Sequence, residues 1–288
     1  LLLSFILVMS SFKADKTRTV FMIGDSTMAN KDISGDKQER GWGMMLMNYL
    51  DDAIVVDNHA VNGRSSKSFI DEGRWGKVLE KIMPGDYVII QFGHNDEKKD
   101  SLRHTEPGST FDENLRRFVR ETRQKGGVPI LMNSVVRRNF SGSATAVADD
   151  DLRDNSSKGL KEGEVLQDTH GEYLVSPYRV AKEMNVAFID ANKITHDLEQ
   201  RLGVEGSKKL HMIFAPGETP SLPQGRQDNT HYNMGQTKWR IFSARPFAES
   251  CRNLPRITRN MMCMFQGQET VDIQICRRQL KMLLVTKR

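Results

Sequence analysis

The chain alternates short, nearly continuous apolar runs with segments whose apolar residues recur at helical spacing. Apolar runs without polar alternation are typical of strands that are buried on both faces of a sheet. Such runs predict strands at 19–23, 53–56, 87–91, 129–132 and 186–189. Helical spacing predicts helices over 42–50, 68–83, 111–124, 172–184 and 194–202. This alternation indicates an α/β fold, with a five-stranded parallel sheet covered by helices on both faces.

Two later segments have no apolar period and are predicted to be irregular. Residues 141–164 are rich in Asp, Ser, Gly and Lys, which predicts an excursion on the surface. Residues 208–227 are rich in proline and glycine, which predicts a loop that carries the following residues to their position.

The first residues of the chain form an apolar run that is followed by small polar residues. The run is too short to span a bilayer, and it matches the hydrophobic region of a secretory signal. The alternative is a buried N-terminal strand. We therefore predict a signal-peptide remnant at 1–14, a domain at 18–235, no stable membrane insertion, and a secreted or periplasmic location.

Charge is distributed unevenly over the chain. The formal net charge is +5, but residues 237–288 hold 11 Lys and Arg against 3 Asp and Glu. The preceding 236 residues hold 31 basic and 34 acidic side chains, so that part of the chain is mildly acidic. The basic balance of the whole chain is therefore no sign of a nucleic-acid partner, and none is predicted.

Four short polar blocks carry the candidate chemistry, and the first and third follow predicted strands. They are Gly24-Asp25-Ser26, Asn62-Gly63, Gly93-His94-Asn95-Asp96 and Asp228-Asn229-Thr230-His231. In open α/β sheets, sites gather at the carboxyl ends of the strands, which is where these blocks are expected.

The blocks contain the groups that ester hydrolysis through an acyl-enzyme requires. A serine such as Ser26 needs a base to become a nucleophile, and His231 is the candidate base. Asp228 precedes His231 by three residues, and one helical turn would place both on the same side. The backbone N–H of Gly63 and the amide of Asn95 are candidate donors to an oxyanion. Each block also has a structural interpretation as a turn or a cap, which we favour for Asp25.

The order of these blocks resembles that of the SGNH, or GDSL-type, hydrolases, a family named for the residues that Ser26, Gly63, Asn95 and His231 match. Longer blocks resemble its rhamnogalacturonan acetylesterase group over about 18–235: Gly24–Ala29, Gly41–Gly43, Asn62–Ile70, Glu72–Trp75, Gln91–Asp96, Asp168–Gly171 and Asp228–Asn233. The resemblance implies a flavodoxin-like three-layer α/β/α domain that removes acetyl groups from pectic rhamnogalacturonan.

The resemblance also implies a role for each matching residue. Ser26 would be the nucleophile, His231 the base and Asp228 the residue that orients it. The N–H groups of Ser26 and Gly63 and the amide of Asn95 would form the oxyanion hole. No cofactor is implied. No metal site is expected either, because His59 and His94 have no partner at metal-ligand spacing.

Three further residues in the matching blocks, Arg64, Arg74 and Trp75, contact either the sugar or the fold itself. An arginine is suited to the charge of a galacturonate, but it can equally pair within the protein. The sequence leaves both roles open.

The match ends near Gly235, where the family continues with an alanine-rich helix. Here a basic segment follows at 236–288, which contains Cys251, Cys263 and Cys276. It is interpreted either as the product of a frameshift or as a genuine extension that binds an acidic partner or the pectin itself. The prediction is a secreted acetylesterase acting on acetylated pectic polysaccharide or oligosaccharide. The alternatives are a lipid or thioester esterase and an inactive carbohydrate-binding protein on the same fold.

Overall fold

The computed structural model describes residues 18–50, 54–140 and 165–233 of the chain. The predicted signal remnant at 1–14, the excursion at 141–164 and the basic segment at 236–288 lie outside the described residues.

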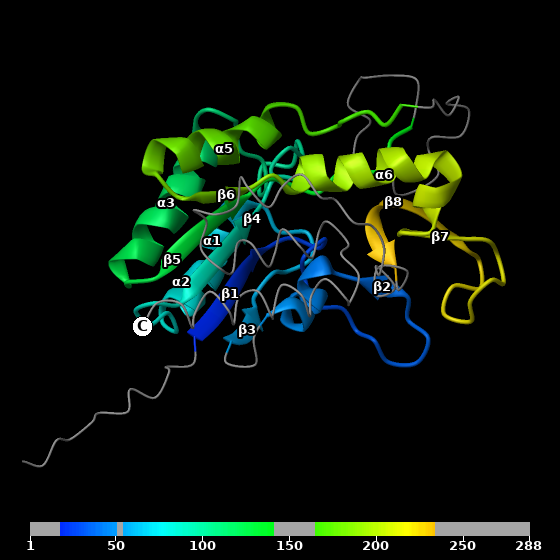
Figure 1. Cartoon of the computed structure of the whole chain (residues 1–288), viewed down its shortest axis with the longest axis horizontal. Coiled ribbons are helices and arrows are strands. Elements are labelled where there is room, and N and C mark those ends of the chain that lie inside the picture. The colour runs from blue at the N-terminus through cyan, green and yellow to red at the C-terminus, as the bar shows by residue number, and fades with distance from the viewer. Residues whose placement is uncertain (1–17, 51–53, 141–164, 234–288) are drawn as a thin grey trace, which may run out of the picture.

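A five-stranded parallel sheet forms the centre of the molecule, in the strand order β3-β1-β4-β5-β6 (Figure 1). Its strands are β1 (Arg18–Gly24), β3 (Ile54–Asn58), β4 (Tyr87–Gln91), β5 (Val128–Met132) and β6 (Ala187–Ile189). All five predicted strands are present, with bounds that differ by at most two residues. The parallel α/β fold expected from the sequence is therefore confirmed.

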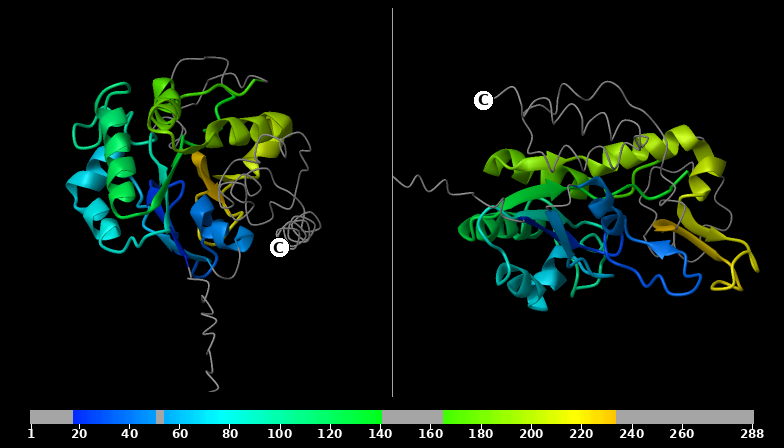
Figure 2. Two further views of the ribbon diagram at one scale, coloured as in Figure 1. Left: turned by 60° about the vertical axis from the view of Figure 1, so that its left-hand side comes forward. Right: turned by 60° about the horizontal axis from the view of Figure 1, so that its bottom comes forward.

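Alternate side chains of the sheet enter two separate cores, because successive residues of a strand point to opposite faces. In β1, Val20 and Met22 belong to one core, while Phe21 and Ile23 belong to the other. Helices cover both cores, which gives the three layers seen in Figure 2. Burial on both faces explains why the strands read as continuous apolar runs rather than alternating ones.

The helices divide between the two faces of the sheet. The core of Phe21 is covered by α1 (Ser66–Asp71), α2 (Arg74–Leu79), α3 (Thr110–Gln124) and α5 (Glu172–Met184). The core of Val20 is covered by the 3₁₀ helix η1 (Trp42–Tyr49) and by α6 (Ala191–Lys208). No helix in these described ranges is long and apolar enough to cross a membrane.

Three predicted helices differ in detail from the observed ones. The helix expected over 68–83 is two short helices, because Gly73 between them has a left-handed backbone with φ +69°. The helix expected over 42–50 is a 3₁₀ helix. The helix expected over 194–202 is longer at both ends, and the Asp190 side chain caps its first turn by accepting from the N–H of Lys193.

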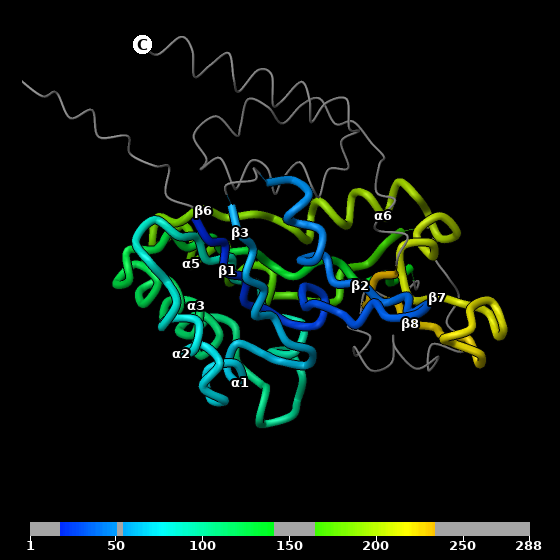
Figure 3. The backbone as a smooth tube through the Cα atoms, turned by 90° about the horizontal axis from the view of Figure 1, so that it is seen from below, coloured from blue at the N-terminus to red at the C-terminus, as the bar shows by residue number. Residues whose placement is uncertain are grey.

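A second, antiparallel sheet was not predicted. It consists of β2 (Glu39–Arg40), β8 (Arg226–Asn233) and β7 (His211–Phe214), in the order β2-β8-β7. It lies at one end of the large sheet (Figures 1 and 3). The loop expected over 208–227 is therefore wrong at both ends, since β7 and the start of β8 occupy them. A four-residue strand beside a Pro- and Gly-rich turn is too short to give a periodic signal.

Candidate active site

A polar cavity lies where the carboxyl ends of the central strands face the small sheet. Its volume is about 240 Å³, and nine residues line it: Ser26, Glu39, Asn62, Gly63, His94, Asn95, Arg103, Thr230 and His231. Ser26 follows β1, Gly63 lies in the turn after β3, and His94 and Asn95 follow β4. The cavity therefore combines residues from all four sequence blocks.

Ser26 stands on a tight turn that its neighbours hold in place. The buried Asp25 accepts hydrogen bonds through Oδ1 from the backbone N–H of Thr27 at 2.9 Å and from the Thr27 hydroxyl at 2.8 Å. The N–H of Ala29 donates to the Asp25 carbonyl at 3.0 Å. Asp25 thus has the turn-forming role favoured from the sequence, and Ser26 remains partly exposed at the cavity.

Ser26, His231 and Asp228 form a continuous hydrogen-bonded chain. His231 Nε2 lies 2.7 Å from Ser26 Oγ, and His231 Nδ1 lies 2.9 Å from Asp228 Oδ2. His231 and Asp228 are both buried. The structure thus brings together the three residues that the sequence proposed as nucleophile, base and orienting carboxylate, although they are up to 205 positions apart.

The helical turn expected at Asp228 and His231 is wrong, because both residues belong to strand β8. His211 of β7 pairs with Tyr232, whereas the next residue, Met212, pairs with Asp228, so β8 contains a bulge between these pairs. Asp228 Oδ1 accepts from the N–H groups of Thr230 and His231, both at 3.0 Å. The carboxylate therefore fixes the bulge, and the bulge turns the His231 ring back toward the same carboxylate.

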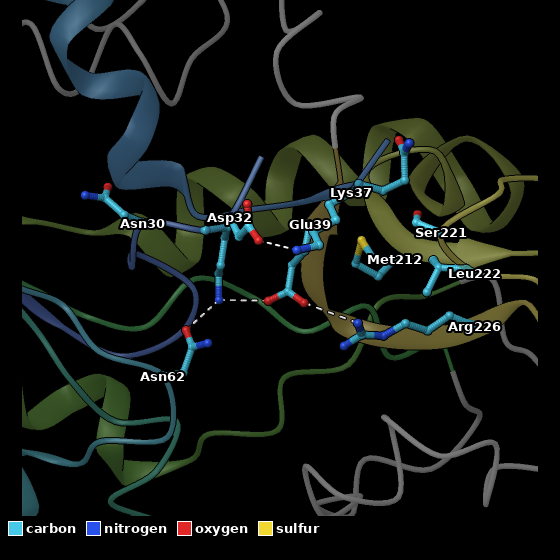
Figure 4. Close-up of a pocket in the computed structure, with 11 residues that line it drawn as sticks. Asn30, Asp32, Lys37, Glu39, Asn62, Met212, Ser221, Leu222 and Arg226 are labelled. Atoms are coloured by element: carbon cyan, nitrogen blue, oxygen red, sulfur yellow. Dashed lines mark hydrogen bonds and ion pairs between the residues drawn. The ribbon is translucent and has the colours of Figure 1, made fainter. Parts of the chain in front are cut away.

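Charged residues extend the hydrogen-bond network beyond Asp228. Arg226 donates to Asp228 Oδ2 at 2.6 Å. It also donates to Glu39 Oε2 at 3.2 Å (Figure 4). The other oxygen of Glu39 lies 2.8 Å from Lys31 Nζ, which also donates to Asn62 Oδ1 at 2.6 Å. Each acidic group in this network is therefore held by a basic one.

The network sets the protonation of its carboxylates. Burial alone would raise the pKa of Asp228, but its hydrogen bond to His231 and the charges of His231 and Arg226 hold that pKa well below its ordinary value. Burial opposes ionisation of Glu39 as well, and electrostatic interactions with His231, Lys31 and Arg226 lower its pKa. Both groups are consequently ionised at neutral pH.

Gly63 and Asn95 face the cavity as candidate donors. Gly63 has φ +75°, and no atom lies within 4 Å of the position that a Cβ would occupy, so a ligand can approach its backbone closely. The buried Asn95 donates one amide hydrogen to the Arg64 carbonyl at 3.2 Å. That bond orients the amide and leaves its second hydrogen available.

Asp96 holds the loop that carries Asn95. It is fully buried and accepts hydrogen bonds from Ser66, from the hydroxyl of Thr105 at 2.9 Å and from the N–H of Gly93 at 3.1 Å. Burial raises the pKa of Asp96 to about 7, and the hydrogen bonds from Ser66 and Thr105 oppose that rise. Its bonds join the loop to the start of α1, so the Asn95 and Gly63 sides of the cavity are fixed to one another.

A buried charged cluster lies behind His94. The rings of His170 and His94 pack edge to face, with their centroids 4.5 Å apart. His170 Nδ1 lies 3.0 Å from Glu97 Oε2. Arg137, which is also buried, pairs with Glu97. Burial opposes ionisation of Glu97, but the charges of Arg137 and His170 lower its pKa. Within the described residues, no three His, Cys, Asp or Glu side chains gather as ligands for a metal ion.

The three residues proposed as sugar contacts line neither this cavity nor the one beside it. Trp75 is 1% exposed, packs edge-on against Phe118 in the apolar core, and donates to Glu121 at 2.5 Å. Arg64 and Arg74 both pair with Glu72, at 3.1 and 2.5 Å. Trp75 is therefore a core residue, whereas Arg64 and Arg74 pair within the protein and stay partly exposed.

Several residues of the site have no motif that identifies them in the sequence. Glu39, Arg226 and Lys31 are single charges in polar stretches, and Arg103 lies in the polar loop after Asp96. Only the pairing of β2 with β8 brings Glu39 to Arg226, and that pairing was not predicted. A second cavity of about 310 Å³ adjoins the first and shares Glu39 and Asn62 with it (Figure 4).

Comparison with known proteins places the chain in a family. The model of the GDSL-like lipase/acylhydrolase family matches residues 22–213. The rhamnogalacturonan acetylesterase RhgT of Bacillus subtilis (strain 168) is 34% identical over 88% of this chain and 97% of its own length. The probable rhamnogalacturonan acetylesterase YesY of the same organism is 29% identical over 74% of this chain and 84% of its own length.

The solved structure of protein YxiM from Bacillus subtilis is also similar. It matches with a TM-score of 0.56 at 25% identity, over 76% of this chain and 52% of that one. These matches confirm the family resemblance seen in the sequence and the predicted enzyme class, a carboxylic ester hydrolase. The chain therefore belongs to the GDSL-like lipase/acylhydrolase family.

Proposed function

We propose that the protein is an acetylesterase that removes O-acetyl groups from pectic rhamnogalacturonan through an acetyl-Ser26 intermediate. The observation that carries the chemistry is the hydrogen bond of 2.7 Å between His231 Nε2 and Ser26 Oγ, because it joins a hydroxyl to an oriented base. The relatives named as rhamnogalacturonan acetylesterases support the substrate.

In the first half of this mechanism, Ser26 Oγ attacks the acetyl carbonyl carbon while His231 Nε2 takes its proton. Asp228, ionised at neutral pH, accepts from His231 Nδ1 and stabilises the imidazolium that forms. The N–H groups of Ser26 and Gly63 and the free amide hydrogen of Asn95 donate to the oxyanion.

The intermediate then expels the sugar oxygen, which takes the proton from His231 Nε2, and Ser26 keeps the acetyl group. In the second half, His231 removes a proton from water as the water oxygen attacks the acetyl carbon. Collapse of the second intermediate breaks the bond to Ser26 Oγ, which takes the proton from His231, and releases acetic acid, which ionises to acetate in solution. No group outside the described site is needed for the proton balance.

The cavity supports a short, polar substrate over a lipid. Its volume lies below the range of roughly 300 to 1,000 Å³ that is typical of sites for drug-sized ligands. All nine described residues that line it are polar or glycine, whereas the apolar side chains Met212 and Leu222 line the adjoining cavity. This favours an acetyl ester of a sugar over the lipid or thioester alternative.

The two hydrogen bonds that link Ser26, His231 and Asp228 also favour catalysis over the alternative of an inactive carbohydrate-binding protein. A polymeric pectic substrate is met outside the cytoplasm, so the proposal includes a secreted or periplasmic location. The apolar run at the start of the chain supports that location.

The test is acetate release from acetylated rhamnogalacturonan by the wild type and by Ser26→Ala, with acetylated xylan as the control substrate. We expect release that favours the pectic substrate and falls on the order of 10⁶-fold in kcat in the variant. Equal release from both polymers would contradict the substrate, and release that survives in Ser26→Ala would contradict the mechanism. Binding of the polymer by folded wild type without any release would identify the binding-protein alternative.

A further inference from the structure

The basic residues around the two cavities differ in how many of their donors are already used. One terminal nitrogen of Arg226 donates a hydrogen bond to Glu39, and the other donates to Asp228. Lys31 is bonded to Glu39 and Asn62, and its side chain is only 5% exposed. These two cations are therefore occupied by the protein's own carboxylates, as Figure 4 shows for Arg226 and Glu39.

Arg103 lines the cavity of Ser26 with its terminal donors unused. Its Nε donates to Asp100 Oδ2 at 2.7 Å, and its backbone N–H donates to the Asp100 carbonyl at 2.9 Å. Within the described part of the chain, neither terminal guanidinium nitrogen has a hydrogen-bond partner. The side chain is 30% exposed, so these nitrogens are accessible to a ligand.

Hydrogen bonds fix the backbone around Arg103, and the bond from Nε to Asp100 holds the guanidinium. The N–H of His104 donates to the Asp100 carbonyl at 2.7 Å, and the N–H of Thr105 donates to the Asp96 carbonyl at 3.0 Å. Asp96 is the buried carboxyl that also holds the Asn95 loop. Arg103 and the oxyanion side of the cavity are therefore anchored to the same residue.

We propose that Arg103 binds the carboxylate of an acidic sugar residue whose chain carries the acetyl group held at Ser26. This inference rests on the proposed function and deepens it by assigning a residue to the recognition of substrate charge. An arginine held through Nε presents its two terminal nitrogens as a planar pair, which is the geometry that carboxylates accept.

The charges of the cavity wall agree with an anionic ligand. Glu39 is the one carboxylate among the nine lining residues, and Lys31 and Arg226 compensate its charge. A substrate carboxylate that enters the cavity therefore meets the two terminal nitrogens of Arg103, which the ion pair between Nε and Asp100 leaves unused. Arg103 thus has the role that the sequence considered for Arg64 and Arg74.

The test changes the charge on both partners. Acetylated rhamnogalacturonan oligosaccharides are assayed with free carboxylates and after methyl esterification, using the full chain and its Arg103→Gln variant. For the wild type we expect esterification to lower kcat/KM by about 10- to 100-fold, mainly through KM, which is the effect of one charged hydrogen-bonded pair. Arg103→Gln should lower kcat/KM for the free acid by a similar factor and lose little more on esterification.

Two further variants serve as controls. Arg103→Lys keeps the charge but not the planar pair of donors, and should recover part of the preference for the free acid. Arg74→Gln removes an arginine that pairs with Glu72 outside both cavities, and should keep the full wild-type preference.

The outcomes separate this inference from the proposed function. A preference for the free acid that persists in Arg103→Gln would overturn the role of Arg103 while leaving the function intact. The role of Arg103 would also be overturned, with the function intact, if the wild type preferred the pectic polymer to acetylated xylan but its kcat/KM were unchanged by esterification. This measurement uses no variant, so it does not depend on whether a variant folds. A wild type that releases no acetate from the pectic polymer would overturn both.

Discussion

The two sides of the cavity are built in different ways. Ser26, Gly63 and Asn95 lie on loops that follow the central parallel strands β1, β3 and β4, of which β1 and β4 are largely buried and β3 is partly exposed. His231 and Asp228 stand on the small antiparallel sheet, in a bulge that is fixed by hydrogen bonds to Asp228 and by the charges of Arg226 and Glu39. On the first side, hydrogen bonds to Asp25 and Asp96 hold loops that follow strands of the central sheet. On the second side, polar contacts hold the strand itself.

Substitutions on the two sides of the cavity should differ in how far they affect the stability of the protein. A residue on the parallel-sheet side can be removed while the backbone of the loop stays in place, because the core holds the strand that precedes it. A residue of the His231 side is at the same time a catalytic partner and a support of its own strand. Substitutions on the two sides should therefore separate activity from stability to different degrees.

After Ser26→Ala, the substitution expected to lower kcat most is Asp228→Asn. An amide at this position would present an N–H toward His231 or Arg226, both of which now donate to the carboxylate. We expect kcat to fall on the order of 10⁴-fold, as it does when a triad carboxylate elsewhere is replaced by its amide. Steady-state kinetics on acetylated rhamnogalacturonan oligosaccharides measures the fall.

Asp228→Asn should also lower the stability of the folded protein. The pKa of Asp228 is lowered in the folded protein, so the carboxylate stabilises the fold above its ordinary pKa and this stabilisation is lost as the pH falls through the lowered value. Asp228→Asn should therefore unfold at a lower denaturant concentration than the wild type at pH 7. An unchanged midpoint would show that the carboxylate does not support the bulge.

A smaller effect is expected on the parallel-sheet side, for Asn95→Ala. Loss of one oxyanion donor elsewhere lowers kcat on the order of 10²- to 10³-fold, and we expect a fall in this range here. KM should change little, because the donor acts on charge that develops in the transition state. Rates within a factor of two of the wild type would remove Asn95 from the oxyanion hole.

The same contrast explains what could be predicted from the sequence. The apolar runs of the central strands gave their positions within two residues, and the blocks that follow them identified Ser26, Gly63 and Asn95. Asp228 and His231 were identified by spacing and resemblance, but with the wrong local structure, since two residues three apart fit a helical turn and a bulge equally well.

The supporting residues of the His231 side had no comparable signal. Glu39 and Arg226 lie 187 positions apart and meet only through the pairing of β2 with β8. β2 has two residues, which is too short for any periodic pattern. The sequence alone does not decide the role of Trp75, because an aromatic residue in a matching block fits a sugar contact as well as a core position. Its burial against Phe118 identifies it as a core residue.

The smallest effect concerns Arg226, which donates to the same Asp228 oxygen as His231 does. If Arg226 positions this carboxylate, Arg226→Gln should lower kcat about tenfold at unchanged KM, which corresponds to about 1.4 kcal/mol of the activation free energy. Arg226→Lys should recover part of the loss, since it keeps one charged donor. Kinetics is measured beside urea unfolding, because Arg226 also bonds Glu39 and its loss should reduce stability.

The matched control is Arg179→Gln, in a second pair that joins a partly exposed arginine to a buried aspartate. Arg179 Nε donates to Asp112 Oδ2 at 2.8 Å, and the pair joins α5 to α3 on the face of Phe21, away from the cavity. This variant should lose stability and keep the wild-type kcat. If the two variants lose stability alike and neither loses activity, then Arg226 only holds β8, and the polar side of the cavity owes its geometry to Asp228 alone.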